Sequence, residues 1–89
     1  MSDDPPQLHL YATFPCRLCE LAWAEIARVI PPDSGIVLEV DIAVDDRLVA
    51  QYGERIPVLR RCVDGAELDW PFDSDAVLAL RQAGTPRFP

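Results

Sequence analysis

Two cysteines separated by two residues, in the segment Cys16-Arg17-Leu18-Cys19, have the spacing in this chain that best suits chemistry. They follow a short apolar segment and stand at the start of an amphipathic one that predicts a helix. Cysteines three apart on a first helical turn lie on one side, close enough for a disulfide. The leading thiol also stands where unpaired N–H groups and the positive end of the helix dipole favour a thiolate. The pattern therefore predicts dithiol–disulfide chemistry.

The two thiols have different expected roles. Cys16 is the expected nucleophile, because the thiolate is the reactive species and the adjacent cation Arg17 favours it in the same way as the helix end does. Cys19 lies one turn deeper and is the expected resolving thiol, which attacks a mixed disulfide formed at Cys16. An ordinary exposed thiol at Cys16 and simple core packing at Cys19 are the alternatives. Cys62, predicted to lie in the middle of a strand, is expected to be structural.

Composition limits the classes of protein to which the chain can belong. Its 89 residues are enough for one domain, and 49% hydrophobic residues argue against disorder. The formal net charge is −7, every basic residue is Arg, and no basic patch favours nucleic acid or an anionic membrane surface as a partner. No segment has the length of a membrane span, and the first residues lack the pattern of a secretory signal. We therefore expect a cytoplasmic location, where a close cysteine pair is more often catalytic or metal-binding than structural.

The elements that must position the thiols can be read from apolar spacing and turn residues. Residues 8–11 predict a strand in which Leu8 and Leu10 share a face, after a disordered lead-in at residues 1–7. A helix is predicted from Cys16 to about Ile30, with Pro15 suited to its first turn and with an apolar stripe that would lie against a sheet. The stripe comprises Cys19, Ala22, Trp23, Ile26, Val29 and Ile30.

The second half of the chain predicts a strand, a short helix, a hairpin and a last helix. Residues 36–42 are almost continuously apolar, which suits a strand covered on both faces. A short helix is expected from a cap at Asp45 or Asp46 through Tyr52, with Gly53 ending it. Strands at 56–63 and 67–70 are expected to form a hairpin joined by Asp64-Gly65. The last helix, at 75–83, would be capped by Asp73 or Ser74, bury Val77, Leu78 and Leu80, and end at Gly84. The order β-α-β-α-β-β-α predicts an α/β fold whose first two strands are parallel neighbours. The hairpin would complete a four-stranded mixed sheet with helices on both faces.

This element order, with the Cys-x-x-Cys at the first helix and Ile56-Pro57 opening the third strand, resembles the thioredoxin superfamily. The segment from Leu10 to Cys19 is similar to the glutaredoxin pattern, in which an apolar-Tyr strand end leads to Cys-Pro-Tyr-Cys. Within that superfamily the chain looks like the glutaredoxins and their small bacterial glutaredoxin-like relatives. The resemblance implies a thioredoxin/glutaredoxin-like domain at residues 8–84 with a C-terminal tail at 85–89. It also implies a cis peptide bond before Pro57, which would face the thiols and leave the Ile56 backbone free to pair with an extended substrate.

Several positions depart from the glutaredoxin pattern. Thr13 stands where the family usually has Lys, and Arg55 stands where it has the Thr of Thr-Val-Pro. The Gly-Gly pair that grips the glutathione amine is only partly echoed by Asp64-Gly65. The residues that usually bind glutathione are therefore only partly present, although the resemblance implies glutathione as a reductant. Arg17, Arg55, Ile56 and Pro57 are the predicted substrate-binding residues, and Arg60 could join the two arginines in a small cationic rim.

We therefore expect a thiol–disulfide oxidoreductase that reduces a disulfide-containing protein or a glutathione mixed disulfide. It would be a monomer with no bound cofactor and no metal. Two other classes stay open. One is a redox-inert thioredoxin-fold module that binds a partner peptide by strand addition. The other is a dimer that shares a zinc or iron–sulfur centre, because a lone Cys-x-x-Cys supplies two of four ligands.

Overall fold

The structure is a computed structural model that describes residues 5–83. It contains four strands and three α-helices in the predicted order, and one 3-10 turn between the second strand and the second helix that was not predicted. In chain order they are β1 (Leu8–Ala12), α1 (Arg17–Ala27), β2 (Val37–Asp41), η1 (Ile42–Val44), α2 (Asp46–Tyr52), β3 (Val58–Arg61), β4 (Glu67–Asp69) and α3 (Ser74–Ala83). No helix within the described residues is long and apolar enough to cross a membrane.

The four strands form one mixed sheet in the order β2-β1-β3-β4. β1 and β2 are parallel, with Leu8 opposite Val37, and β3 is antiparallel to both β1 and β4. Tyr11 of β1 lies opposite Val58 of β3, so the end of β1 that leads to the cysteines meets the beginning of β3. The predicted parallel pair, hairpin and mixed sheet are confirmed.

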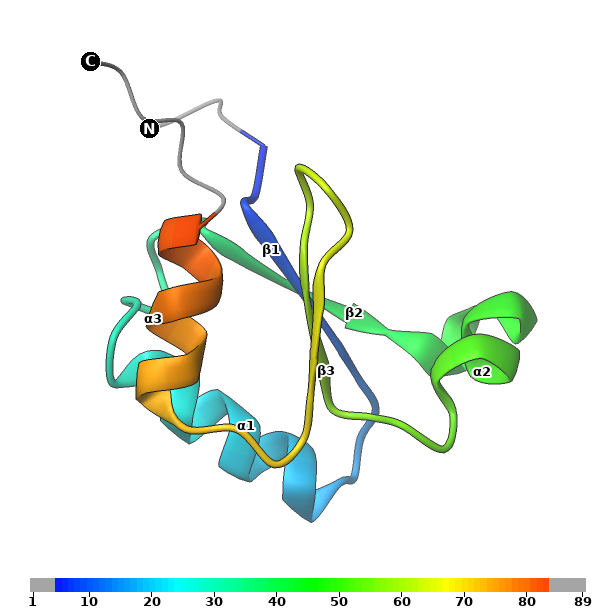
Figure 1. Cartoon of the computed structure of the whole chain (residues 1–89). Coiled ribbons are helices and arrows are strands. Elements are labelled where there is room, and N and C mark those ends of the chain that lie inside the picture. The colour runs from blue at the N-terminus through cyan, green and yellow to red at the C-terminus, as the bar shows by residue number, and fades with distance from the viewer. Residues whose placement is uncertain (1–4, 84–89) are drawn as a thin grey trace.

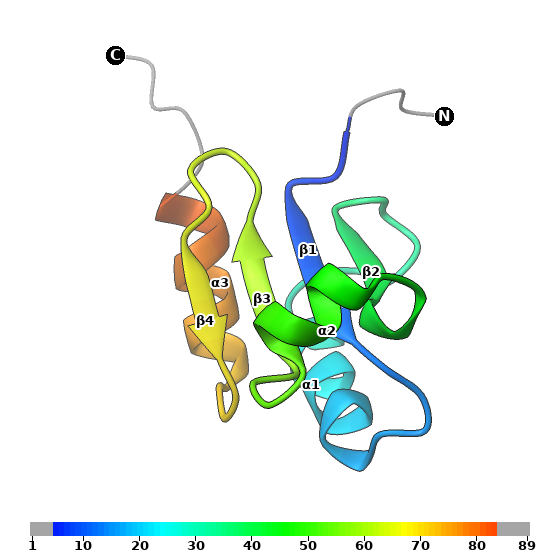
Figure 2. The same cartoon turned by 90° about the vertical axis from the view of Figure 1, so that its right-hand side faces the viewer.

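Helices cover both faces of the sheet, as predicted. Figure 1 views the sheet nearly edge-on, with α1 and α3 on one side and α2 on the other. In Figure 2 the turned molecule places α2 in front of the strands and the other two helices behind them. The connector between β1 and α1 emerges at the end of the sheet at which α2 also begins.

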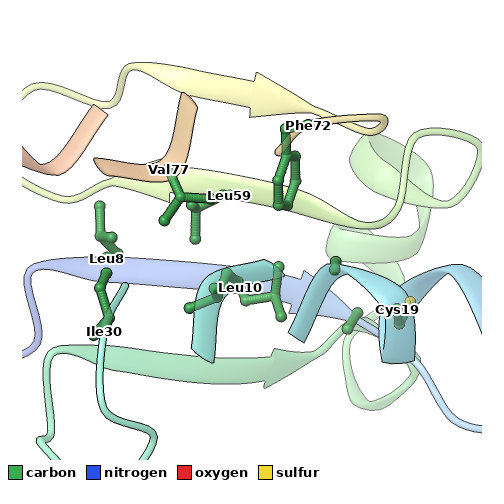
Figure 3. Close-up of a cluster of buried hydrophobic side chains, with 10 residues drawn as sticks. Leu8, Leu10, Cys19, Ile30, Leu59, Phe72 and Val77 are labelled. Atoms are coloured by element: carbon green, nitrogen blue, oxygen red, sulfur yellow. The ribbon is translucent and has the colours of Figure 1, made fainter. Parts of the chain in front are cut away.

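The main hydrophobic core lies between the sheet and the pair α1 and α3. Leu8 and Leu10 share this face and are fully buried, which confirms the predicted alternation of β1. Figure 3 shows them beside Leu59 of the neighbouring strand β3 and close to Ile30 and Val77, with Cys19 at the end of the cluster near the exit from β1. The complete set of buried residues is Leu8, Leu10, Ala12, Cys19, Ala22, Ile26, Ile30, Leu59, Phe72 and Val77. The helix stripe predicted from sequence therefore anchors α1, and Cys19 with it.

A second, smaller core lies beneath α2. The rings of Tyr11 and Tyr52 stack with centroids 4.2 Å apart, next to the buried side chains of Ile42 and Val58. The Tyr52 hydroxyl donates a 2.7 Å hydrogen bond to the Glu67 carboxylate. The pKa of Tyr52 is raised to about 12, with burial as the largest cause and this hydrogen bond as the next. These contacts join α2 to β1, β3 and β4 next to the site.

Polar side chains begin the second and third helices as the sequence predicts. The Asp45 carboxylate accepts a 2.8 Å hydrogen bond from the Arg47 amide at the start of α2. Asp73 accepts a 2.8 Å bond from the Ala76 amide in the first turn of α3. The hairpin turn places Gly65 at a φ of +77°, a conformation that side chains disfavour. Asp45 and Asp73, among the alternatives predicted, are therefore the capping residues.

Three local predictions are wrong. β2 is an edge strand, and Leu38 is half-exposed, because α2 covers the sheet beside Tyr11 and Val58 but not beside Leu38. Cys62 lies just beyond β3, in the loop that turns towards β4, instead of mid-strand. Pro15 precedes the helix, because Cys16 is the N-cap residue.

The ends of the described chain bear on two further expectations. Gln7, assigned from sequence to the lead-in, donates its N–H to the Ile36 carbonyl and accepts a bond from the Cys62 amide. The lead-in at residues 1–4, the predicted helix end at Gly84 and the tail at 85–89 lie outside the described residues.

Candidate active site

Cys16 is the N-cap residue of α1 and is partly buried. Its backbone is extended, with φ −156° and ψ 110°, and its Sγ accepts a hydrogen bond of 3.2 Å from the Cys19 amide. The sulfur thus takes the place that a Ser or Asp oxygen takes in an ordinary N-cap. A negatively charged sulfur would be the stronger acceptor at this helix end. The local geometry therefore fixes the Cys16 sulfur at the start of the helix.

Cys19 is fully buried one turn deeper and faces the main core (Figure 3). The pKa of its thiol is raised to about 11, with burial as the largest cause and a hydrogen bond with Cys16 as the next. A backbone hydrogen bond involving Thr13 lowers this pKa. Both thiols are free in the structure. The predicted asymmetry is present, with Cys16 partly buried and Cys19 fully buried.

Ile56 and Pro57 lie beside the connector that carries the thiols. The register that pairs Tyr11 with Val58 places Pro57 level with the end of β1. The Ile56–Pro57 peptide bond is cis, as the resemblance implied, and Phe14–Pro15 and Trp70–Pro71 are also cis. The Ile56 amide is not free, because it donates a 3.0 Å hydrogen bond to the Tyr52 carbonyl. Within residues 5–83 no backbone amide donates to the Ile56 carbonyl, so an extended substrate could still pair there.

The three arginines do not form one rim. Arg17 is exposed at the start of α1 and makes no ion pair with another described residue. Arg55 lies between the carboxylates of Glu67 and Asp69, with N–O distances of 2.7 Å to each. Arg60 is farther along β3, opposite His9, and its guanidinium packs against Gly65. Of these three arginines, Arg17 and Arg60 make no ion pair within residues 5–83, and only Arg17 follows Cys16 directly in the sequence.

The ion pairs of Arg55 fix its guanidinium against β4. Hydrogen bonds to Asp69 and then Glu67 raise its pKa further above its ordinary range. Its guanidinium also lies over the Tyr52 ring, 5.4 Å from the centroid. The structure therefore shows Arg55 clamping the loop before Ile56 onto β4.

Two other predicted features lie at the far end of the sheet. The Asp64-Gly65 segment forms the hairpin turn, and the Cys62 amide pairs with Gln7, beyond the start of β1. Since the five residues of β1 separate that end from the thiols, the distance along the sheet is roughly 16 Å. Cys62 is therefore not a disulfide partner for Cys16, and the Asp64-Gly65 pair is not placed to contact a ligand bound there.

Comparison with known proteins agrees with this geometry. A family model described as "Glutaredoxin-like domain (DUF836)" matches residues 7–80, which include both thiols and the Ile56-Pro57 segment. The chain belongs to this glutaredoxin-like family. The thioredoxin-superfamily resemblance seen in the sequence is thereby confirmed.

Solved structures of similar chains share the glutaredoxin-like fold. The crystal structure of XcR50 from X. campestris is 38% identical over 88% of this chain and 99% of its own, with a TM-score of 0.74. Protein Ne2328 from Nitrosomonas europaea, solved by NMR, is 30% identical over 89% of this chain and 94% of its own, with a TM-score of 0.64. A malarial protein at 16% identity, with a TM-score of 0.59, shows the fold alone. No curated protein gives a significant match.

The glutaredoxin-like domain also has features near the thiols that the sequence argument missed. The Trp23 indole donates a 2.9 Å hydrogen bond to the Glu39 carboxylate, whose charge contributes to the raised pKa of Cys19. Phe14 and Leu18 are about half-exposed on either side of Cys16. The sequence did contain a signal for this exposure. Both side chains are apolar and lie within or beside the Cys-x-x-Cys segment, yet neither belongs to the buried stripe of α1.

The metal-binding alternative finds no single-chain site in the described part of the protein. Within residues 5–83, no three His, Cys, Asp or Glu side chains are grouped so that they could hold a metal ion. The thiols of Cys16 and Cys19 form a pair, and Cys62 lies at the opposite end of the sheet. A metal centre here would need ligands from a second chain.

Proposed function

We propose that this glutaredoxin-like protein is a thiol–disulfide oxidoreductase that reduces protein disulfides or glutathione mixed disulfides. The observation that carries the proposal is the 3.2 Å hydrogen bond from the Cys19 amide to Cys16 Sγ at the start of α1. This bond holds the Cys16 sulfur at the first turn of α1, three residues before the buried Cys19, which is the arrangement that exchange between two thiols needs. The buried Cys19 thiol supports the second half of the reaction, because it is shielded from external disulfides.

The reaction divides into two exchanges between sulfurs. The Cys16 thiolate attacks one sulfur of the substrate disulfide, a mixed disulfide forms, and the other substrate sulfur leaves as a thiolate that takes a proton from water. Cys19 then loses its proton, attacks Cys16 Sγ and releases the second substrate thiolate. The substrate gains two electrons and two protons, and the protein is left with a Cys16–Cys19 disulfide. An external thiol, with glutathione as one candidate, reduces that disulfide.

The predicted substrate contacts form part of the proposal. The Ile56 carbonyl would line one side of the substrate, and Arg17 would attract an acidic group beside the disulfide. The Pro57 ring is fully buried, so it would support the Ile56 backbone from behind and would not contact the substrate. Arg55, in its ion pairs with Glu67 and Asp69, would act by holding the Ile56 backbone in place. A monomer in the cytoplasm, where free thiols persist, is the proposed setting.

Replacing each thiol separately tests the mechanism. Cys16→Ser should abolish reduction of a small mixed disulfide, whereas Cys19→Ser should accumulate a mixed disulfide on Cys16 that mass spectrometry detects. Cys62→Ser is the matched control and should retain the wild-type rate. Equal activity of Cys16→Ser and wild type would refute the proposal.

A redox-inert binding module is the second candidate function, favoured by the exposed Phe14 and Leu18 beside the thiols. Such a module would bind its partner without sulfur exchange. Replacement of both Cys16 and Cys19 by Ser would then leave partner affinity unchanged. If the protein is an oxidoreductase, the same double variant would instead fail to form a covalent complex with its substrate.

A further inference from the structure

A groove opens between α1 and the segment that joins β4 to α3. Leu21 and Ala24 line it from the helix, and Trp70, Pro71 and Phe72 line it from the opposite wall. The groove has a volume of about 660 Å³ and a mainly apolar lining. The Trp70 and Phe72 rings pack edge to face with centroids 5.1 Å apart, which fixes this wall. We call it the α1 groove.

Exposed apolar side chains connect the α1 groove to the reactive thiol. Phe14 is 53% exposed, Leu18 46% and Leu21 39%. Leu18 and Leu21 are three apart on α1 and therefore neighbours on its surface, and Leu21 also lines the groove. Leu18 and Leu21 thus extend the apolar surface along the helix into the groove, and Phe14 adds an exposed ring two residues before Cys16. Continuous exposed apolar surface of this kind marks binding sites on folded proteins.

The charges around the surface indicate which partner it fits. The carboxylates of Glu25 and Asp73 line the far end of the α1 groove. Glu25 accepts a hydrogen bond from the Ser74 amide and pairs at 3.4 Å with the exposed Arg28, and Asp73 accepts a bond from the Ala76 amide. Two carboxylates beside one arginine leave this end of the groove negatively charged. Glutathione carries two carboxylates, and of the three candidate arginines only Arg17 both follows Cys16 directly and makes no ion pair within residues 5–83, because Glu67 and Asp69 hold Arg55. A second copy of this acidic chain, with net charge −7, would bring more negative charge to the same surface. An apolar segment that carries a basic side chain fits better.

We propose that Phe14, Leu18 and the α1 groove dock the polypeptide that flanks a substrate cysteine. The docked segment is extended, with a large apolar side chain near the cysteine and a basic side chain beyond it. This inference rests on the proposed oxidoreductase function, and it identifies the substrate class as a protein disulfide, in preference to a glutathione mixed disulfide.

The dimensions of α1 set the spacing of that segment. Leu21 and Glu25 follow Cys16 by five and nine residues, or roughly 7.5 and 13.5 Å along the helix axis. An extended chain advances about 3.3 Å per residue. An apolar side chain about two positions from the substrate cysteine therefore reaches Leu21. A basic side chain about four positions away reaches Glu25, where it would compete with the exposed Arg28.

Three mixed disulfides of thionitrobenzoate test this preference. The first is a nonapeptide with a central Cys, Leu at the second position on each side and Arg at the fourth. The second has Ser in place of both Leu, and the third is glutathione. Attack of the reduced Cys16 thiolate on the peptide or glutathione sulfur joins that sulfur to Cys16 and releases thionitrobenzoate, which absorbs visible light. The second-order rate constant is measured for each.

We expect the Leu peptide to react about tenfold faster than the Ser peptide or glutathione. Leu21→Ala should slow the Leu peptide roughly threefold to tenfold and leave the other two unchanged. Ala24→Gln, which narrows the groove without removing a core contact, should have the same selective effect. Leu38→Ala, which shortens a comparably exposed leucine on the edge strand, is the matched control and should change no rate.

Equal rates for the three compounds on the wild type would overturn the proposal. So would a Leu21→Ala variant that slows all three equally, because Leu21 would then act on Cys16 itself. A wild-type dimer in sedimentation that becomes monomeric in Leu21→Ala would assign the α1 groove to a second copy and overturn it as well.

A binding measurement separates failure of docking from failure of the redox function. The Leu peptide with Ser in place of its central Cys is titrated into the isotope-labelled protein while backbone amide resonances are recorded. Shifts concentrated at residues 21–25 and 72–76, absent with the Ser-for-Leu peptide, would support docking even if no compound released thionitrobenzoate. No shift, or shifts at α2 only, would overturn docking even if all three compounds reacted.

Discussion

Removal of Cys16 gives a quantitative test of how Cys19 is protected. The pKa of Cys19 is raised from 9.0 to about 11, with burial as the largest cause and the hydrogen bond with Cys16 as the next. At pH 8 a thiol with a pKa of 9 is about one-tenth thiolate, and one with a pKa of 11 is about one-thousandth thiolate. Cys19 in the folded protein should therefore alkylate at least about 100 times more slowly than in the denatured chain.

The Cys16→Ala variant removes only the smaller cause. The Cys19 alkylation rate should rise, but by less than about tenfold, because burial persists. Iodoacetamide labelling followed by mass spectrometry of each cysteine measures both rates, and Cys62 serves as the internal reference. Two results would refute the reasoning: folded Cys19 alkylating as fast as in denatured protein, or a rise of more than a hundredfold in Cys16→Ala.

Other predictions concern stability. Because the pKa values of Cys19 and Tyr52 are raised in the folded protein, the unfolded chain loses these protons first as the pH rises. The free energy of unfolding should therefore fall from pH 9 to 11 through Cys19 and from pH 10 to 12 through Tyr52. Urea titrations across this range check the sign, and Tyr52→Phe should lack the upper part of the decline. Leu59→Ala, in the fully buried core, should lower the free energy of unfolding by about 2–5 kcal/mol, and a urea midpoint no lower than wild type would contradict the assigned core. Asp45→Ala removes the cap of α2 and should lower it by about 1 kcal/mol, whereas Asp45→Asn, which keeps an acceptor oxygen, should nearly match wild type.

The sequence predicts the element order, the mixed sheet and the outer and inner placing of the two thiols, because each depends on local spacing. The apolar positions of α1 recur at helical spacing, and Cys19 belongs to that stripe, so its burial follows from the pattern. The Asp64-Gly65 turn follows from residues that tolerate positive φ. Such features need no knowledge of distant contacts.

Features that depend on strand order or distant segments were not predictable in the same way. Residues 36–42 have an apolar run that also suits a central strand, and only the assembled sheet shows that β2 lies at an edge. Arg55 was predicted to meet a substrate, and its ion pairs depend on a hairpin register that brings Glu67 and Asp69 beside it. The α1 groove likewise needs Trp70 to come against Leu21, 49 positions apart in the sequence.

A redox titration tests the central claim most directly. The protein is equilibrated across a glutathione series, quenched, and each cysteine is assigned by mass spectrometry. The account predicts a reversible Cys16–Cys19 disulfide with a midpoint of roughly −270 to −180 mV, the range of known oxidoreductases, while Cys62 stays outside the pair. If Cys16 and Cys19 stay reduced even in strongly oxidising buffer, the oxidoreductase proposal is contradicted.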